Sequence, residues 1–171
     1  MTDADDIIYF FIEAENFTEG NAAEFRDEGF TTWMGHPSGG RTLIYSDNQS
    51  GYTKYGLGGL KDGEYYLFVR HLAFAKPLAS VEVFVGGASA GITDFDRAGT
   101  YLCWSKRIGP FKITAGAQLT LKIAAGNIIA PFADALLITN DPDCVPDNTD
   151  QDFKTHSRKA SRVKIDQLVF T

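Results

Sequence analysis

The feature that most constrains the fold of this chain is the recurrence of an apolar residue at every second position in two short segments. Residues 81–85 read Val-Glu-Val-Phe-Val, and residues 118–123 read Gln-Leu-Thr-Leu-Lys-Ile. Successive side chains of a β-strand point to opposite faces, so apolar residues two positions apart line one face. Both segments therefore predict half-buried β-strands.

Other segments are rich in β-branched and aromatic residues and are bounded by glycine, proline, aspartate or asparagine, which favour turns. They are residues 7–13, 41–46, 64–73, 100–108 and 133–139. No amphipathic helix separates them, and many short strands without helices favour antiparallel pairing. We therefore predict an all-β fold, an antiparallel β-sandwich of the jelly-roll type, with turns at Gly86-Gly87 and at Lys61-Asp62-Gly63.

The composition of the chain changes after Thr139. Residues 140–147 are acidic and contain proline, residues 154–164 are basic, and residues 163–170 regain β propensity. The total length of 171 residues is sufficient for one domain with its own core. We therefore divide the chain into a β-sandwich domain of residues 1–140 and a C-terminal extension of residues 141–171, with an added strand near its end.

The charge and the apolar segments of the chain argue against two classes of partner. The formal net charge is −6, whereas binding to a phosphate backbone depends on clustered lysine and arginine. The apolar stretch of residues 7–12 is too short to span a bilayer, and it lacks the basic flank and cleavage site of a signal peptide. We therefore expect neither nucleic acid nor a membrane as a partner.

The residues that usually carry catalysis are scattered. The three histidines lie far apart in the sequence, and the two cysteines, Cys103 and Cys144, form no Cys-x-x-Cys unit. The glycine-rich residues 56–59 are not followed by the Lys-Ser or Lys-Thr of a phosphate loop. We predict that the chain is not an enzyme, and the sequence leaves open whether the two cysteines form a disulfide.

Seven pieces of the chain, taken in order, resemble carbohydrate-binding modules of families six and thirty-five, which are galactose-binding-like β-sandwiches. The pieces are residues 11–17, 38–43, 63–70, 81–87, 101–104, 115–121 and 133–139. The resemblance covers about residues 8–140 and leaves the C-terminal extension outside it. It implies the same sandwich fold that the strand pattern predicts.

The resemblance also implies a structural calcium ion that joins the first strand to the last. The matching acids here are Glu13, Glu15 and Asp134. Two carboxylates at positions i and i+2 of a strand lie on one face, and Ca²⁺ takes six to eight oxygen ligands. The alternative is that these acids face solvent on an edge strand.

In the family, two aromatic rings at the loop end of the sandwich pack against a sugar, and an asparagine binds its hydroxyl groups. The matching aromatic residues are Tyr101 and Trp33, with Phe30 as the alternative to Trp33. The position where the family often has its asparagine holds Phe132, so Asn127 is the substitute that this sequence offers. The alternative for each ring is a place in the core or at its rim.

These implications lead to two hypotheses about function. The first is a non-catalytic carbohydrate-binding module, extracellular or at the cell surface, whose partner is a polysaccharide or oligosaccharide and whose cofactor is a structural Ca²⁺. The second is a structural subunit of an extracellular assembly or filament, in which residues 163–170 add a strand to a neighbouring subunit. The size of the protein in solution separates them.

Overall fold

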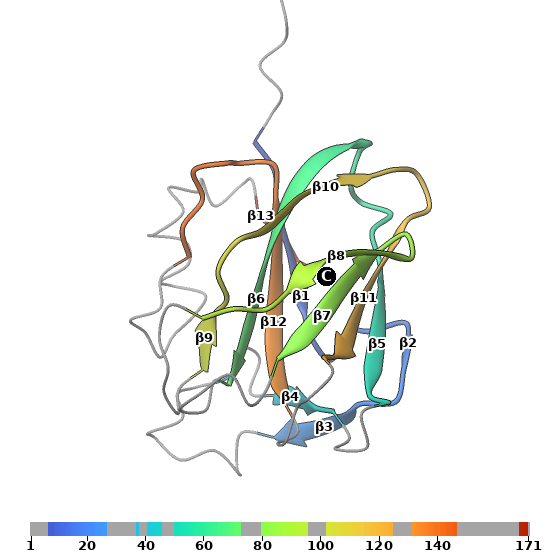
Figure 1. The fold of residues 1–171 in the computed structure, drawn as a ribbon, viewed down its shortest axis with the longest axis vertical. Helices are drawn as coiled ribbons and strands as arrows, with labels where there is room; N and C mark the ends of the chain where they lie inside the picture. The colour runs from blue at the N-terminus through green and yellow to red at the C-terminus, as the bar shows by residue number, and fades with distance from the viewer. Residues whose placement is uncertain are drawn as a thin grey trace, which may run out of the picture.

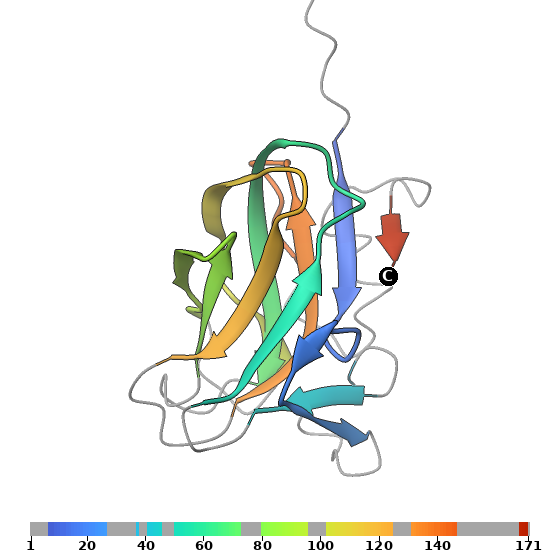
Figure 2. The same cartoon turned by 90° about the vertical axis from the view of Figure 1, so that its right-hand side faces the viewer.

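A computed structural model describes residues 7–26, 37, 41–45, 50–72, 80–95, 102–124, 131–146 and 168–170. The strands form two sheets that pack face to face (Figures 1 and 2). Among the described residues all strand pairings are antiparallel except one, and no helix there is long and apolar enough to cross a bilayer. The predicted all-β antiparallel sandwich is confirmed.

We call the two sheets A and B. Sheet A has the order β10-β6-β12-β1-β13, with β4 joined to β12, β3 to β4 and β9 to β6; sheet B has the order β2-β5-β11-β7-β8. The strands of sheet A are β1 (Tyr9–Glu13), β3 (Ala23–Arg26), β4 (Arg41–Ile44), β6 (Gly63–Leu72), β9 (Leu102–Trp104), β10 (Ile108–Ile113), β12 (Phe132–Thr139) and β13 (Leu168–Phe170). Those of sheet B are β2 (Glu19–Gly20), β5 (Tyr52–Gly56), β7 (Val81–Val85), β8 (Ala88–Ile92) and β11 (Gln118–Ile123).

The core between the sheets follows the period-two pattern of the sequence. On β7 the valines are buried while Glu82 and Phe84 are half-buried, and β11 buries every second residue in the same way. The facing residues come from alternate positions of β1, β6 and β12. The buried cluster between the sheets includes Phe10, Ile12, Leu67, Val69, Val83, Leu119, Leu121, Leu136 and Ile138.

The outer face of sheet A is buried as well. A second apolar cluster lies there, formed by Tyr9, Phe11, Phe68, Trp104, Ala135, Leu137 and Cys144, each at most 4% exposed. Cys144 belongs to the C-terminal extension, whereas the other members lie on the strands of sheet A. Trp104 is 1% exposed and is among the largest fully buried side chains. Sheet A is therefore a central layer, with apolar packing on both of its faces.

Five of the described strands lie wholly or mostly outside the segments that the sequence predicted, namely β2, β3, β5, β8 and β10. β8 reads Ala-Ser-Ala-Gly-Ile and has no buried residue, so it carries no apolar alternation. It pairs with β7 through the predicted two-residue turn, where Gly86 and Gly87 both have positive φ, at 58° and 85°. Such a turn suits the twist of a hairpin and favours glycine at both positions. β10 begins at Ile108, so the predicted strand of residues 100–108 is divided between β9 and β10.

The C-terminal extension is tied to sheet A through its described residues. The hydroxyl group of Tyr9 donates a hydrogen bond to Asp141 Oδ2 at 2.5 Å. At the end of the chain, β13 pairs in parallel with β1 of the same chain (Figure 2). A late strand is therefore present within residues 163–170, at Leu168–Phe170. Its predicted addition to a neighbouring subunit stays a prediction.

The two cysteines are both buried, and neither forms a disulfide. Cys103 lies opposite His71 in the β6–β9 pairing, while Cys144 packs with Trp104 in the outer cluster. Because neighbouring residues of a strand point to opposite faces, Cys103 and Trp104 project from opposite sides of sheet A. The question that the sequence left open is thus answered for this structure, since no disulfide joins the two residues.

Candidate functional site

The predicted sugar-binding residues Trp33, Tyr101 and Asn127 lie outside the residues that the structure describes. Their placement therefore stays a prediction. In the sequence, Tyr101 directly precedes β9 and Asn127 precedes β12. The start of β9 pairs with the end of β6, and the start of β12 pairs with the end of β4. The same end of sheet A holds Glu13, at the end of β1 (Figure 1). We call it the loop end.

The three predicted calcium ligands lie at the loop end. Glu13 is opposite Ala135 in the β1–β12 pairing, and the main-chain NH of Ala14 donates a hydrogen bond to the carbonyl oxygen of Asp134 at 3.0 Å. Glu15 follows directly after the end of β1. The first and last strands of the predicted domain are therefore side by side, as a calcium ion that joined them would require.

A β-bulge determines the direction of Asp134. In the β12–β6 pairing Ala133 lies opposite His71 and Ala135 lies opposite Arg70, so Asp134 is the extra residue. A regular strand would turn Asp134 into the core between the sheets, with Leu136. The bulge instead brings its carboxylate to Arg70, where Nη1 lies 2.5 Å from Oδ2 and the two side chains are 2% and 0% exposed.

Glu15 has a carboxylate oxygen that no described residue satisfies. Its Oε2 atom is buried and has no hydrogen-bond partner among the described residues. Burial, with smaller contributions from the charges of Glu13 and Asp134, raises the pKa of Glu15 to about 7 against the opposing effects of its own main chain and of Arg41. The three acids therefore lie close enough to repel one another, which is the electrostatic condition for a cation site.

The donors at this cluster fit calcium by their chemistry. Ca²⁺ prefers carboxylate and carbonyl oxygens, and a buried Glu15 oxygen without a partner is the kind of atom that a cation satisfies. The side chains do not converge as a finished ligand set, since among the described residues no group of three His, Cys, Asp or Glu is arranged to hold a metal. Asp134 also gives one of its oxygens to Arg70. Glu13 and Glu15 are accordingly the principal candidates as ligands.

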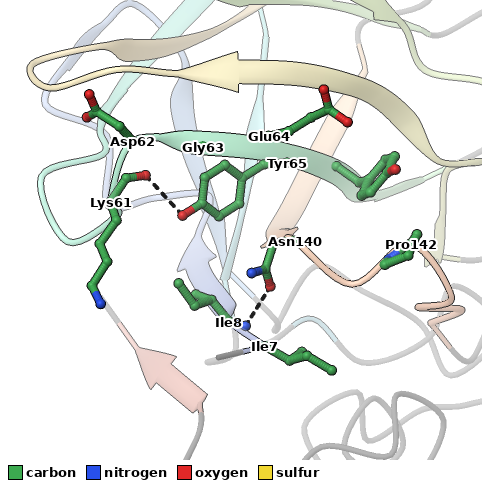
Figure 3. A pocket seen from close by; sticks show the side chains of 10 residues that line it. Ile7, Ile8, Lys61, Asp62, Gly63, Glu64, Tyr65, Asn140 and Pro142 are labelled. Atoms are coloured by element: carbon green, nitrogen blue, oxygen red, sulfur yellow. Dashed lines mark hydrogen bonds between the residues drawn. The ribbon is translucent and has the colours of Figure 1, made fainter. Parts of the chain in front are cut away.

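A cavity of about 470 Å³ lies at the opposite end of the sandwich (Figure 3). It is lined by Ile7, Ile8, Lys61, Asp62, Gly63, Glu64, Tyr65, Tyr66, Asn140 and Pro142. Residues 7–8 precede β1, residues 61–66 lead into β6, and residues 140–142 follow β12, so all three segments meet where these strands begin or end. The sequence predicted no more than a turn at residues 61–63. Nothing in a local pattern brings these three distant segments together.

No protein-family model matches this chain. No curated protein matches it either. The comparisons that carry information are therefore those with solved structures.

Several solved structures share the fold of this chain. A family 35 carbohydrate-binding module from Clostridium thermocellum matches with a TM-score of 0.55 and 18% identity, over 76% of this chain and 96% of that module. A family 36 module in complex with calcium and xylotriose matches with a TM-score of 0.50 and 16% identity, over 75% of this chain and 98% of that module. The chain thus has the β-sandwich fold of carbohydrate-binding modules.

The chain also matches part of an enzyme. An exo-β-1,3-galactanase from Phanerochaete chrysosporium matches with a TM-score of 0.53 and 17% identity, over 75% of this chain. This chain spans only 28% of the length of that enzyme. The similarity therefore concerns one part of a longer protein, and like the other two it establishes the fold alone.

Proposed function

We propose that this chain is a non-catalytic carbohydrate-binding module that binds a polysaccharide or oligosaccharide at its loop end. The observation that carries the proposal is the fold. This chain matches almost the whole length of the family 35 and family 36 modules, which are carbohydrate-binding modules with the same sandwich. A polysaccharide ligand implies a place outside the cell, so the proposal includes an extracellular protein.

The proposed chemistry rests on Tyr101, Trp33 and Asn127, which the proposal assigns to the loop end. An aromatic ring suits the apolar C–H face of a pyranose, whereas the hydroxyl groups need amide or carboxylate partners. Phe132 begins β12 and is half-buried, and it has no polar group with which to bind a hydroxyl. The proposal therefore gives the hydroxyl-binding role to Asn127.

Replacing Tyr101 by alanine is the direct test of this site. Calorimetric titration of plant, algal and bacterial oligosaccharides is expected to give binding heat with the parent protein and at least about tenfold weaker binding with Tyr101→Ala, because a stacked ring is lost. Ile92→Ala is the matched control, since Ile92 is a large side chain, 53% exposed, on β8. Equal binding by all three proteins would contradict the role of Tyr101, and silence across the panel would contradict the proposed function.

The second part of the proposal is a structural calcium ion at the loop-end acids. Glu13 and Glu15 would hold it with their carboxylates, and main-chain carbonyls would complete the shell. When bound, the ion supplies positive charge that offsets the repulsion among Glu13, Glu15 and Asp134. The support is the buried Glu15 oxygen without a partner and the pKa of Glu15, raised to about 7.

Calcium is expected to raise the melting temperature of the parent protein but not that of Glu15→Gln. The effect should grow with pH up to about 7 and then level off, because below that pH a proton occupies Glu15 and the ion must displace it. In EDTA the pH dependence of stability has the opposite sign. The folded state binds the Glu15 proton more tightly than the unfolded state, so the contribution of Glu15 to the free energy of unfolding is lost as the pH rises toward 7.

Scanning calorimetry at pH 5.5 and pH 8, with calcium or with EDTA, measures this effect. Glu19→Gln is the matched control, because Glu19 is an exposed acid whose partner is Lys54 at 3.0 Å. An equal calcium response in Glu15→Gln and the parent would remove Glu15 from the site.

A further inference from the structure

We propose that the cavity at the end opposite the loop end is a second site, for the end of a neutral sugar chain. This inference rests on the proposed function, because it assigns a further position for the same class of ligand. The volume of about 470 Å³ lies within the range of small-molecule pockets, roughly 300–1,000 Å³.

The walls of the cavity are held in place by hydrogen bonds. The main-chain NH of Ile8 donates to Asn140 Oδ1 at 2.7 Å, and the Tyr65 hydroxyl donates to the carbonyl oxygen of Lys61 at 3.0 Å (Figure 3). Each bond ties down a segment of the lining. A cavity whose walls are already ordered loses little conformational entropy when a ligand enters.

A third wall is fixed by Arg107 of the segment between β9 and β10. Its guanidinium group donates a hydrogen bond to the carbonyl oxygen of Pro142 and lies 4.7 Å from the centre of the Tyr66 ring. Arg107 therefore joins the β6 side of the cavity to the C-terminal extension. The cavity depends on residues 140–142 and is a feature of the domain together with its extension.

The lining combines the groups that recognise a sugar. Lys61, Asp62 and Glu64 are exposed and polar, and the lining also includes the apolar side chains of Ile7 and Ile8. Hydroxyl groups need both donors and acceptors, while the ring C–H groups need an apolar surface. Asp62 and Glu64 carry two negative charges, and Lys61 and the neighbouring Arg107 carry two positive charges, so the charges at the cavity balance and favour a neutral ligand. A neutral sugar satisfies both requirements.

Gly63 keeps part of the cavity open. A Cβ atom at this position would lie 3.4 Å from Cε2 of Tyr65, which is ordinary van der Waals contact, and φ of Gly63 is not in the left-handed region. A larger side chain therefore fits the backbone but projects beside the Tyr65 ring. Gly63→Leu is accordingly a substitution that adds bulk to the lining at a position without a positive φ.

Two sites at opposite ends of one sandwich have a functional consequence. Sites on the same face would bind one chain together, whereas sites at opposite ends bind separate chains. The protein would then connect two glycan chains. A polysaccharide mixed with the protein should form cross-linked, scattering particles, which a single-site module does not produce.

The experiment counts sites by calorimetric titration of β-1,3-galactotriose and xylotriose, with calcium present, into the parent protein and its variants. The expected stoichiometry is two sugars per parent chain, one for Gly63→Leu and one for Tyr101→Ala. Gly58→Leu is the matched control, because a Cβ atom there meets no atom within 4 Å and Gly58 does not line the cavity. Glu64→Ala provides a second cavity variant, with binding weakened by about tenfold at that site.

The outcomes separate this inference from the proposed function. One sugar per chain, lost in Tyr101→Ala and unchanged in Gly63→Leu and Glu64→Ala, overturns the cavity site and leaves the loop-end site in place. One sugar per chain, lost in Gly63→Leu and retained in Tyr101→Ala, supports the cavity and removes the loop-end site. No binding of either trisaccharide by the parent overturns the cavity site for these sugars. Circular dichroism of each variant confirms that it is folded.

Discussion

Replacing Arg70 by methionine is expected to lower the free energy of unfolding by about 3–5 kcal/mol. Arg70 and Asp134 form an ion pair in which the two side chains are 2% and 0% exposed. Methionine replaces the aliphatic part of the arginine side chain but has no charge, so the substitution leaves the Asp134 carboxylate in the interior without its cation. Chemical denaturation in EDTA measures the loss without a contribution from calcium.

The controls for this prediction use a second ion pair and a second substitution. Lys106 and Asp94 are 3.3 Å apart, with side chains 50% and 67% exposed, and Lys106→Met should cost at most about 1 kcal/mol because solvent screens an exposed pair. Replacing Asp134 by asparagine in the Arg70→Met background should recover part of the loss, since it removes the buried charge. A cost below about 1 kcal/mol for Arg70→Met would show that water reaches Asp134.

Ending the chain after Asn140 is expected to leave a protein that aggregates or fails to fold. The truncation removes Cys144 from the outer face of sheet A, the bond from Asp141 to Tyr9, and β13 from the edge of β1. Exposing large apolar side chains costs about 1.5–3 kcal/mol each, against a total stability of about 5–15 kcal/mol for a typical domain. Light scattering and the binding of a hydrophobic dye to the truncated protein measure the outcome.

Two neighbouring residues of the extension give a milder version of the same test. Cys144 is 4% exposed and Val145 is 69% exposed. Cys144→Asp places a charge in the outer cluster and should lower the free energy of unfolding by about 3 kcal/mol or more, whereas Val145→Asp should leave it nearly unchanged. A soluble, cooperatively folding chain of residues 1–140 would instead support the predicted boundary at residue 140, and equal effects of the two aspartates would show that Cys144 does not anchor the extension.

Much of the fold was predictable because it depends on local patterns. The valines of β7 and the apolar residues of β11 mark one buried face each, and Gly86-Gly87 supplies the positive φ values that their hairpin turn uses. These signals survive in the sequence because strand geometry has a period of two. β8 was missed because none of its residues is buried, so its sequence carries no apolar alternation.

The candidate site was predictable only in part. The acids Glu13, Glu15 and Asp134 were identified through a family resemblance, and the structure places them at one end of the sandwich. The resemblance gave no sign that Asp134 binds Arg70, because that contact depends on a bulge in the β12–β6 pairing. The sequence of one strand does not show where its pairing with a neighbouring strand will contain a β-bulge.

The sequence by itself determined that this chain forms a β-sandwich, because apolar alternation and turn residues act over a few neighbouring positions. The tertiary structure alone decided that both faces of sheet A carry buried apolar residues, that Cys144 packs on its outer side, and that a cavity forms from residues 7–8, 61–66 and 140–142. These features join segments up to about 130 positions apart. They depend on which strand ends meet in space, and no local pattern of residues records that.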